Sequence, residues 1–301
     1  MSFDQRQCRS RAAGLECWQE KRRRASMDVR SILLVIAPTA SKIDVQNALT
    51  LAAVANDHLA VLVAAIADPP TVGDYPVGEI WLDKREQDLA SVESEVVRCK
   101  EQCELAGLSF EVDSIYPERA WADAAIAAHA LCFDLVLIGS SALRDPELKP
   151  RLIGGVLFDA GQPAMLLPDH PSTLCPRKVL LAWDGSVPAG RAVRAGHDIL
   201  VAAEEVHVVL VDQPRSRFEG GDEPGAGMAN YLARHGINVV VDRIASCGCP
   251  ISDVLVRHAR EIGADLIVMG AYGHSRLRER ILGGVTRATI DQLKLPALMA
   301  H

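Results

Sequence analysis

The chain is poor in aromatic residues. Phe, Trp and Tyr make up 4% of its 301 residues, although hydrophobic residues as a whole make up 49%. A core of ordinary size must therefore be built from Ala, Val, Leu and Ile, as in sheets packed between helices. The length favours about two domains of roughly 150 residues each.

Long apolar runs and an excess of basic residues are also lacking. The longest apolar run, Leu59 to Ala67, has the length of a strand, whereas a membrane-spanning helix needs roughly 18 residues. The first 27 residues contain no apolar middle segment, so no secretory signal is indicated. The net charge of −7 argues against a general nucleic-acid binder. We expect a soluble, cytoplasmic protein that binds neither membranes nor nucleic acid.

The eight cysteines show no repeated C-x2-C spacing of the kind that holds zinc. Free thiols in a reducing compartment are the simplest interpretation. Cys247 and Cys249 lead into a predicted helix and form either a turn with free thiols or a redox or metal site. Cys99 and Cys103, one helical turn apart, are either part of a plain helix or a pair of metal ligands.

Common catalytic motifs are missing as well. The sequence contains no G-x-x-x-x-G-K-[ST] phosphate loop, no G-x-S-x-G nucleophile elbow and no H-E-x-x-H zinc helix. We therefore expect no dedicated enzyme.

What the chain does contain is a repeat of itself. Strand-like segments, a helix position occupied by histidine and a glycine pair recur in both halves. The matching segments are Gly107–Asp113 with Gly236–Asp242, His129 with His258, Asp134–Gly139 with Asp265–Gly270, Gly154–Val156 with Gly283–Val285, and Pro163–Leu166 with Pro296–Met299. A repeat this long indicates a duplicated domain. A structural role is favoured for the two histidines.

Each half alternates between apolar strands and helices. In the second half, near-continuous apolar runs predict parallel strands buried on both faces. These strands are Lys178–Trp183, Val206–Val211, Asn238–Ile244, Asp265–Met269 and Ala297–Ala300. The intervening helices are predicted at Gly190–Ala202, Gly225–His235, Ile251–Ile262 and Val285–Leu293. This alternation predicts an α/β fold of two tandem doubly wound domains with right-handed crossovers.

Domain boundaries follow from changes in composition. Residues 1–27 carry the basic run Lys21–Arg24 and form either a disordered tail or extension, or a basic docking arm. The first domain is expected at residues 28–168 and the second at 176–301. The proline-containing segment between them is a linker.

One segment of the second half has the features of an anion site. It runs from Met269 at the end of a predicted strand, through Gly270, Tyr272 and Gly273, to a second cluster that precedes a helix; this cluster is Gly283, Gly284, Val285 and Thr286. Glycines allow a ligand to approach the backbone, and free N–H groups at a helix start favour phosphate. Glycines at a strand exit also occur in ordinary turns.

The first strand of the second half adds a carboxylate at the same edge. Ala182 and Trp183 are followed by Asp184, Gly185 and Ser186. In an open α/β sheet, ligands bind at the carboxyl ends of the strands, where Asp184 could accept hydrogen bonds from a ribose or an adenine. The alternative is that Asp184 only stabilises the turn into the next helix.

These residues resemble the signature of the universal stress protein family. Nucleotide-binding members carry Gly, two residues, Gly, nine residues, then Gly followed by Ser or Thr. Gly270, Gly273 and Gly283 meet this spacing, and Gly284 stands where the family has the hydroxyl residue. The resemblance spans about residues 28–301 as two copies.

The resemblance implies a five-stranded parallel sheet flanked by helices in each copy. It also implies binding of ATP or another adenine nucleotide, with Asp184 holding the adenosine and Val211 touching the base. Some members hydrolyse ATP slowly, so at most weak turnover is expected here.

The first copy departs from the signature. Ala37 or Pro38 stands in place of Asp184, and Ala142 stands in place of the second glycine. A Cβ where a positive φ is needed costs on the order of 1 kcal/mol. We expect this half to be structural.

Three functions remain open at this stage. The first is a nucleotide-binding regulatory protein that contacts an unidentified protein partner, forms a homodimer and pairs its own halves as a pseudo-dimer through their last strands. The second is an adenine-nucleotide-dependent enzyme of a related α/β fold. The third is a duplicated scaffold that binds no nucleotide.

Overall fold

The computed structural model describes most of the two predicted domains. The described residues are 31–39, 42–55, 57–69, 79–169, 171, 173, 175–212, 225–271, 284–291 and 294–301. Residues 1–27 and the signature residues Tyr272, Gly273 and Gly283 lie outside them. The described chain divides into two compact units, one within Val29–His170 and one within Pro171–His301. We call them the N-terminal and the C-terminal domain.

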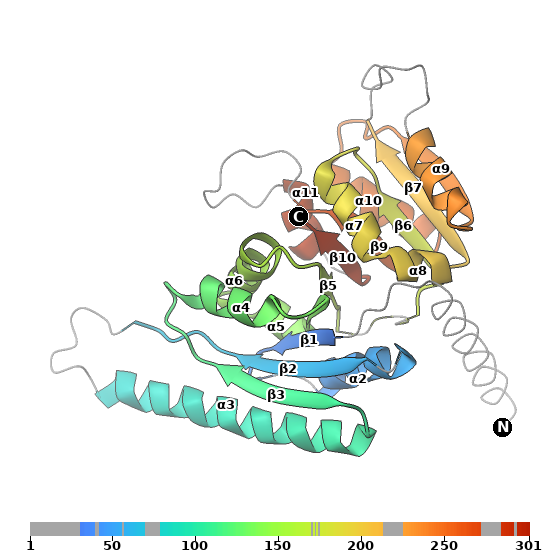
Figure 1. The fold of residues 1–301 in the computed structure, drawn as a ribbon. Helices are drawn as coiled ribbons and strands as arrows, with labels where there is room; N and C mark the ends of the chain where they lie inside the picture. Colours follow the sequence, from blue (N-terminus) through green and yellow to red (C-terminus); the bar gives the residue numbers. More distant parts are fainter. Residues whose placement is uncertain are drawn as a thin grey trace, which may run out of the picture. The chain divides into compact units, whose positions relative to one another are not determined.

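The N-terminal domain contains a parallel sheet in the order β3-β2-β1-β4-β5 (Figure 1). Its strands are β1 (Ser31–Ile36), β2 (His58–Ala64), β3 (Phe110–Ile115), β4 (Leu135–Ile138) and β5 (Ala164–Leu166). Its helices are α2 (Lys42–Ala55), α3 (Glu79–Ala106), α4 (Ala122–Ala130), α5 (Ser140–Arg144) and α6 (Leu148–Ile153), followed by the π-helical turn Gly154–Asp159.

The C-terminal domain has the same strand order, β8-β7-β6-β9-β10, and its strand pairs are also parallel. Its strands are β6 (Lys178–Ala182), β7 (Glu205–Val211), β8 (Val239–Ile244), β9 (Leu266–Gly270) and β10 (Ala297–Ala300). Its helices are α7 (Val187–Ala195), α8 (His197–Ala202), α9 (Ala226–Arg234), α10 (Ile251–Glu261) and α11 (Gly284–Asp291). The prediction of two five-stranded parallel sheets is confirmed.

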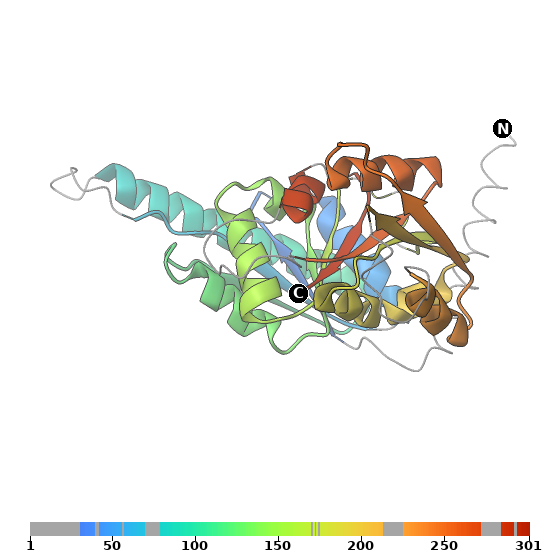
Figure 2. The ribbon, with the colours of Figure 1, turned by 90° about the horizontal axis from the view of Figure 1, so that it is seen from above.

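Helices cover both faces of the C-terminal sheet. Helices α7 to α9 connect strands that step from β6 to β7 and β8, whereas α10 and α11 connect strands that step in the opposite direction, from β8 across to β9 and on to β10. Because parallel crossovers are right-handed, the two directions place the two sets of helices on opposite faces. Figure 2 shows α10 and α11 on one side of these strands and α7 and α8 on the other.

Burial on both faces explains the apolar strands. All four residues of β4 are buried, and in β9 the first four are buried and Gly270 is half-buried.

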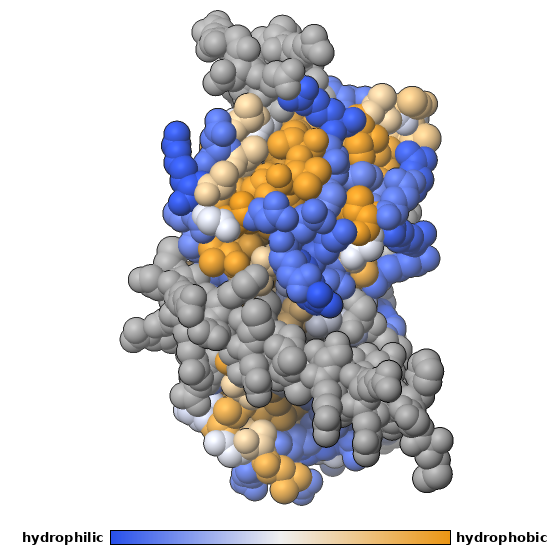
Figure 3. Space-filling view, turned by 90° about the vertical axis from the view of Figure 1, so that its right-hand side faces the viewer, coloured by the Kyte–Doolittle hydropathy of each residue, from blue (hydrophilic) through white to orange (hydrophobic). Residues whose placement is uncertain are grey.

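Among the helices that the structure describes, none has both the length and the apolar character that crossing a membrane requires. Figure 3 shows apolar patches bordered by polar surface on one side of the molecule.

A repeated aspartate ties the first and fourth strands of each domain together. Asp134 accepts hydrogen bonds from the backbone N–H of Ser31 at 3.0 Å and from its hydroxyl at 2.8 Å. Asp265 accepts them from the N–H groups of Arg177 and Lys178 at 2.9 and 3.1 Å. This shared contact explains why the aspartate recurs in both halves of the sequence.

The helix predicted at residues 190–202 differs from the observed one. Helix α7 begins earlier, at Val187, because Ser186 caps it and a proline occupies its first turn. The helix is then interrupted at Gly196, where α8 begins in a new direction. A Cβ at Gly196 would lie 2.7 Å from the side chain of Leu298, so this glycine allows the helix to approach β10 closely.

Candidate functional site

The candidate site lies where strands β6 and β9 end side by side. These strands are neighbours at the centre of the sheet, and Ala182 pairs with Met269. From β6 the chain continues to β7 on one side and later returns to β9 on the other. This reversal makes the β6/β9 boundary the topological switch point, outside which ligands bind in open α/β sheets.

Several predicted site residues lie at this carboxyl edge. Ala182 ends β6, Val211 ends β7, and Met269 and Gly270 end β9. Asp184 follows β6 by two residues and is half-buried. The fold thus brings together residues that the sequence separates by more than 80 positions.

The segment after β6 forms a tight, hydrogen-bonded turn. Oδ1 of Asp184 accepts a hydrogen bond from the N–H of Ser186 at 2.9 Å, and Gly185 has a φ of +75°. The hydroxyl of Ser186 accepts from the N–H of Ala189 at 3.2 Å and caps α7. Asp184 therefore stabilises the turn that leads into α7.

Gly270 has a packing role in addition to its place in the signature. A Cβ on this residue would lie 2.8 Å from the carbonyl carbon of Pro188 and still closer to the backbone nitrogen of Ala189. The absence of a side chain allows the first turn of α7 to pack directly on the end of β9. Gly270 is thus required by the fold whether or not a ligand binds.

Helix α11 begins with the last part of the signature. Gly284 is its first residue, and Val285 is half-buried. The side chain of Thr286 is buried, with 3% of the residue exposed. The first N–H groups of a helix have no acceptor within it, so a ligand contact at this end would come from backbone amides.

The equivalent position in the N-terminal domain is filled by a carboxylate of the chain itself. Strand β4 ends before Gly139, and α5 begins with Ser140 and Ser141. Oδ1 of Asp44 accepts hydrogen bonds from the N–H and hydroxyl of Ser140, at 3.1 and 2.9 Å. Oδ2 accepts from the same groups of Ser141, at 3.1 and 2.7 Å.

This arrangement occupies the anion site that a strand end and a helix start would otherwise offer. Asp44 has no exposed surface. A Cβ on Gly139 would lie 2.9 Å from its carboxyl group, so the glycine at this strand end admits the carboxylate of Asp44. Sequence reasoning identified the lost glycine and the lost aspartate of this copy but missed Asp44. The pair of hydroxyl residues after Gly139 was the available signal.

The sequence analysis also missed a second carboxylate, Asp212, at the carboxyl edge of the sheet in the C-terminal domain. Asp212 follows Val211 in the left-handed conformation, with a φ of +52°. Its carboxylate accepts a hydrogen bond from the N–H of Ser246 at 2.9 Å. Hydrogen bonds from Ser246 lower the pKa of Asp212. This residue fixes the loop that follows β8 beside the end of β7.

The cysteines of helix α3 are buried structural thiols. Cys99 and Cys103 have no exposed surface. Burial, with a smaller contribution from Glu95, raises the pKa of Cys99 to about 12, and burial raises that of Cys103 to about 11. Metal binding requires thiolates, so this environment favours the plain-helix interpretation. Cys247 and Cys249 are exposed, and Cys247 has a φ of +52°.

Comparison with known proteins finds a family match for the C-terminal domain. The model of the universal stress protein family matches residues 176–301. A universal stress protein from Synechocystis is 27% identical over 171 residues, which cover 55% of this chain and 57% of that relative. The match thus spans little more than half of the relative's length.

Solved structures share the fold across most of the chain. A universal stress protein from Archaeoglobus fulgidus is 20% identical with a TM-score of 0.61, over 88% of this chain and 94% of that one. A functionally unknown protein from Pseudomonas aeruginosa is 19% identical with a TM-score of 0.54, over 90% and 92% of the two chains. Residues 176–301, which form the C-terminal domain, thus match the universal stress protein family, and most of the chain shares the fold of these two structures.

Proposed function

We propose that the C-terminal domain binds an adenine nucleotide such as ATP at the carboxyl edge of its sheet. The observation that carries this proposal is the pairing of Ala182 with Met269 at the topological switch point, so that Asp184 and Gly270 follow paired strand ends at the same edge of the sheet. The nine-residue spacing between Gly273 and Gly283 adds the pattern of a phosphate loop.

Each residue then has a defined role. The carboxylate of Asp184 accepts hydrogen bonds from the ribose hydroxyls or the adenine amino group. Ala182, Val211 and Met269 provide apolar contact to the base. Backbone N–H groups of the loop that begins at Gly270 bind the phosphates.

The second cluster of the signature binds the phosphates from the other side. Backbone amides at the start of α11, from Gly284 to Thr286, contribute here, and the helix dipole favours negative charge at this end. Gly284 lacks the family's hydroxyl group, so amides make this contact. Tyr272, Gly273 and Gly283 complete the loop that connects the two ends of the signature.

The N-terminal domain is proposed to bind no nucleotide. The N–H groups at its equivalent strand end already bond to Asp44, and a phosphate would have to displace a buried carboxylate. Ala37 also offers no carboxylate in place of Asp184. The protein therefore takes up one nucleotide per chain.

The proposed role is regulatory and belongs to a stress response. A nucleotide shifts a conformational equilibrium by its differential affinity for the two states. Binding at the C-terminal edge would favour one state that contacts a partner protein or a second copy of the chain. Catalysis beyond slow ATP hydrolysis is not part of this proposal.

The test measures nucleotide directly. The purified full-length chain is denatured and the supernatant analysed for adenine nucleotide, and ATP binding to the nucleotide-free chain is measured by titration calorimetry. We expect Asp184→Ala to weaken binding about 10- to 100-fold, because a hydrogen bond to a charged group contributes roughly 1.5–3 kcal/mol. Gly273→Val tests the second glycine of the signature and leaves Gly270, on which α7 packs, unchanged.

Matched controls separate binding from folding. Asp184→Asn keeps the acceptor for Ser186 and removes the charge, whereas Asp159→Ala removes an exposed carboxylate of the N-terminal domain. The Asp159 variant should bind ATP like the wild type. If the wild-type chain neither carries adenine nucleotide nor binds ATP at millimolar concentration, the scaffold function replaces this proposal.

A further inference from the structure

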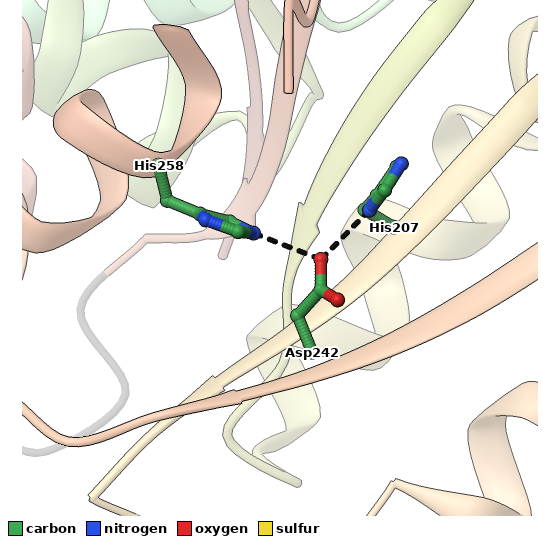
Figure 4. Close-up of side chains that lie close together, drawn as sticks. All are labelled: His207, Asp242 and His258. Carbon is green, nitrogen blue, oxygen red and sulfur yellow. Dashed lines mark hydrogen bonds and ion pairs between the residues drawn. The ribbon is translucent and has the colours of Figure 1, made fainter. Parts of the chain in front are cut away.

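Three side chains from separate elements converge in the C-terminal domain (Figure 4). His207 comes from β7, Asp242 from β8 and His258 from α10. Nδ1 of His207 lies 2.7 Å from Oδ2 of Asp242, and Nε2 of His258 lies 2.8 Å from the same oxygen. The three candidate ligand atoms all lie within 4.8 Å of one another.

The cluster is partly withdrawn from solvent. The side chains of His207, His258 and Asp242 are 10%, 16% and 22% exposed. Burial raises the pKa of Asp242, but hydrogen bonds from His258 and His207 lower it more, and the net shift is downward. The carboxylate of Asp242 thus faces two imidazole nitrogens in a sheltered position.

Each histidine also faces a second carboxylate with its other ring nitrogen. Nε2 of His207 lies 3.1 Å from Oε2 of Glu205, and Nδ1 of His258 lies 3.5 Å from Oε2 of Glu261. Lys178 holds Glu205 in place at 3.0 Å. Both rings are therefore placed between two carboxylates.

Both ring nitrogens of each histidine face carboxylate oxygens. A neutral imidazole carries a single N–H, so it can donate to one of its two carboxylates and turns a lone pair towards the other. A metal ion between the rings and Asp242 removes this conflict. The lone pairs then bind the metal, and the N–H groups donate to Glu205 and Glu261, as ligating histidines usually do.

We propose that His207, Asp242 and His258 form a binding site for a divalent transition-metal ion, with Zn²⁺ as the preferred ion. Two imidazole nitrogens and one carboxylate oxygen suit zinc, and a water completes four-fold coordination. Tetrahedral Zn²⁺ with ligand distances of about 2.0–2.1 Å places its ligand atoms about 3.3 Å apart. Each of the two ring nitrogens would therefore move away from Oδ2 of Asp242 by roughly 0.5 Å. The two nitrogens, which lie within 4.8 Å of each other, would also settle at about 3.3 Å.

The site is separate from the proposed nucleotide site. His207 is the third residue of β7, and four more residues follow it in the strand, the last of which is Val211. Metal at this position would clamp β7 and β8 to helix α10. Failure of metal binding would therefore leave the nucleotide proposal untouched, and the reverse also holds.

The N-terminal domain supplies an internal comparison. Asp113 pairs with Leu62 as Asp242 pairs with Val209, so Ala60 occupies the position of His207. Asp113 and His129 remain, with an O–N distance of 3.6 Å, but their side chains are 72% and 34% exposed. The duplicated fold thus does not require the third ligand, and its presence in the C-terminal domain is a specific feature.

The test uses the full-length chain in which every cysteine except the buried Cys99 and Cys103 is changed to Ser, so that accessible thiols do not bind zinc. The changed residues are Cys8, Cys17, Cys132, Cys175, Cys247 and Cys249. After treatment with a chelator, the chain is titrated with Zn²⁺ by calorimetry, and Co²⁺ serves as a spectroscopic probe. We expect one Zn²⁺ per chain and a tetrahedral Co²⁺ spectrum without thiolate charge-transfer bands.

Single substitutions assign the ligands. His207→Ala, which reproduces Ala60 of the other domain, should weaken Zn²⁺ binding roughly 100-fold or more, and Glu205→Gln about 10- to 100-fold. His129→Ala should bind Zn²⁺ like its parent. Asp242→Asn serves as the second ligand variant if His207→Ala fails to fold. Absence of Zn²⁺ binding in the parent, or equal binding in the ligand variants, would overturn the proposal.

Discussion

Asp44 is the acceptor of a cluster of buried hydrogen bonds in the N-terminal domain. Its carboxylate accepts four hydrogen bonds from Ser140 and Ser141 and has no exposed surface. Asp44→Ala would leave four buried donors without their acceptor. Because hydrogen bonds to charged groups contribute about 1.5–3 kcal/mol each and do not add simply, we expect the free energy of unfolding to fall by about 3 kcal/mol or more.

Urea unfolding followed by circular dichroism measures this loss. Asp113→Ala is the matched control, because its side chain is 72% exposed and surface substitutions usually change stability by less than about 0.5 kcal/mol. If Asp44→Ala lowered the free energy of unfolding by less than about 1 kcal/mol, the four donors would have found other acceptors, such as water. The position of the carboxylate would then be open to an anion.

Gly270 allows a separate prediction about packing. A methyl group at this position would collide with the backbone at Pro188 and Ala189, and backbone cannot move aside as a side chain can. We expect Gly270→Ala to destabilise the C-terminal domain by about 1–3 kcal/mol, with or without ATP.

Gly227→Ala provides the control for this substitution. Gly227 lies in helix α9, and a Cβ there would meet nothing within 4 Å. Replacing a helical glycine with alanine in open space should raise stability by about 0.5–1 kcal/mol. Thermal unfolding of both variants compares the two effects. If Gly270→Ala were as stable as the wild type, the close approach of α7 to β9 would be wrong.

At the scale of elements, helix α3 determines which thiols react. Burial disfavours the thiolate and raises the pKa of Cys99 to about 12 and the pKa of Cys103 to about 11. At pH 8 we expect iodoacetamide to label the exposed Cys132, Cys247 and Cys249 and to leave the two helix thiols unmodified, because the thiolate is the reactive form.

Mass spectrometry of labelled peptides measures the modification, with the chain unfolded in urea as the control in which all the cysteines react.

The raised pKa values of Cys99 and Cys103 also predict a change in stability with pH. The thiols of the unfolded chain ionise near their ordinary value of 9.0, whereas the buried ones stay protonated. Raising the pH above 9 therefore favours the unfolded chain. Rapid labelling of Cys99 at pH 8 would contradict the burial of this thiol in the folded chain.

Strands could be predicted from the sequence because their signal is local. Burial on both faces makes each strand a short apolar run, so β6 to β10 lie within a residue or two of their predicted bounds. The start and interruption of α7 could not be predicted in the same way. Gly196, where the helix is interrupted, packs closely against Leu298, which is about a hundred residues further along the chain.

The missed site residues share this dependence on distant partners. Asp44 bonds to residues 96 and 97 positions away, and His207 bonds to a residue 35 positions away. Neither residue stands in a local motif. Comparing the two halves position by position would have singled out His207, because the other half has Ala60 there. The glycine signature was recognisable because its residues are close in sequence.

At the scale of the whole molecule, the two domains share a fold but should respond differently to nucleotide. Their strand orders are the same. In the N-terminal domain, however, Asp44 binds the N–H groups that follow β4, whereas the C-terminal domain carries the proposed nucleotide site. Hydrogen exchange with mass spectrometry of the full chain can locate the response. We expect added ATP to slow exchange in peptides that contain Ala182–Ser186 and Gly284–Thr286.

Peptides of the N-terminal domain that contain Ile36–Pro38 and Gly139–Ser141 provide the control within the same molecule. Their amides should exchange at the same rate with and without ATP, because the donors of Ser140 and Ser141 already bond to Asp44. At ATP concentrations 100 times the dissociation constant, binding stabilises the occupied domain by about 2.7 kcal/mol. Since local exchange from native states tracks such free energies, equal protection of both domains would mean that the duplication preserved two nucleotide sites.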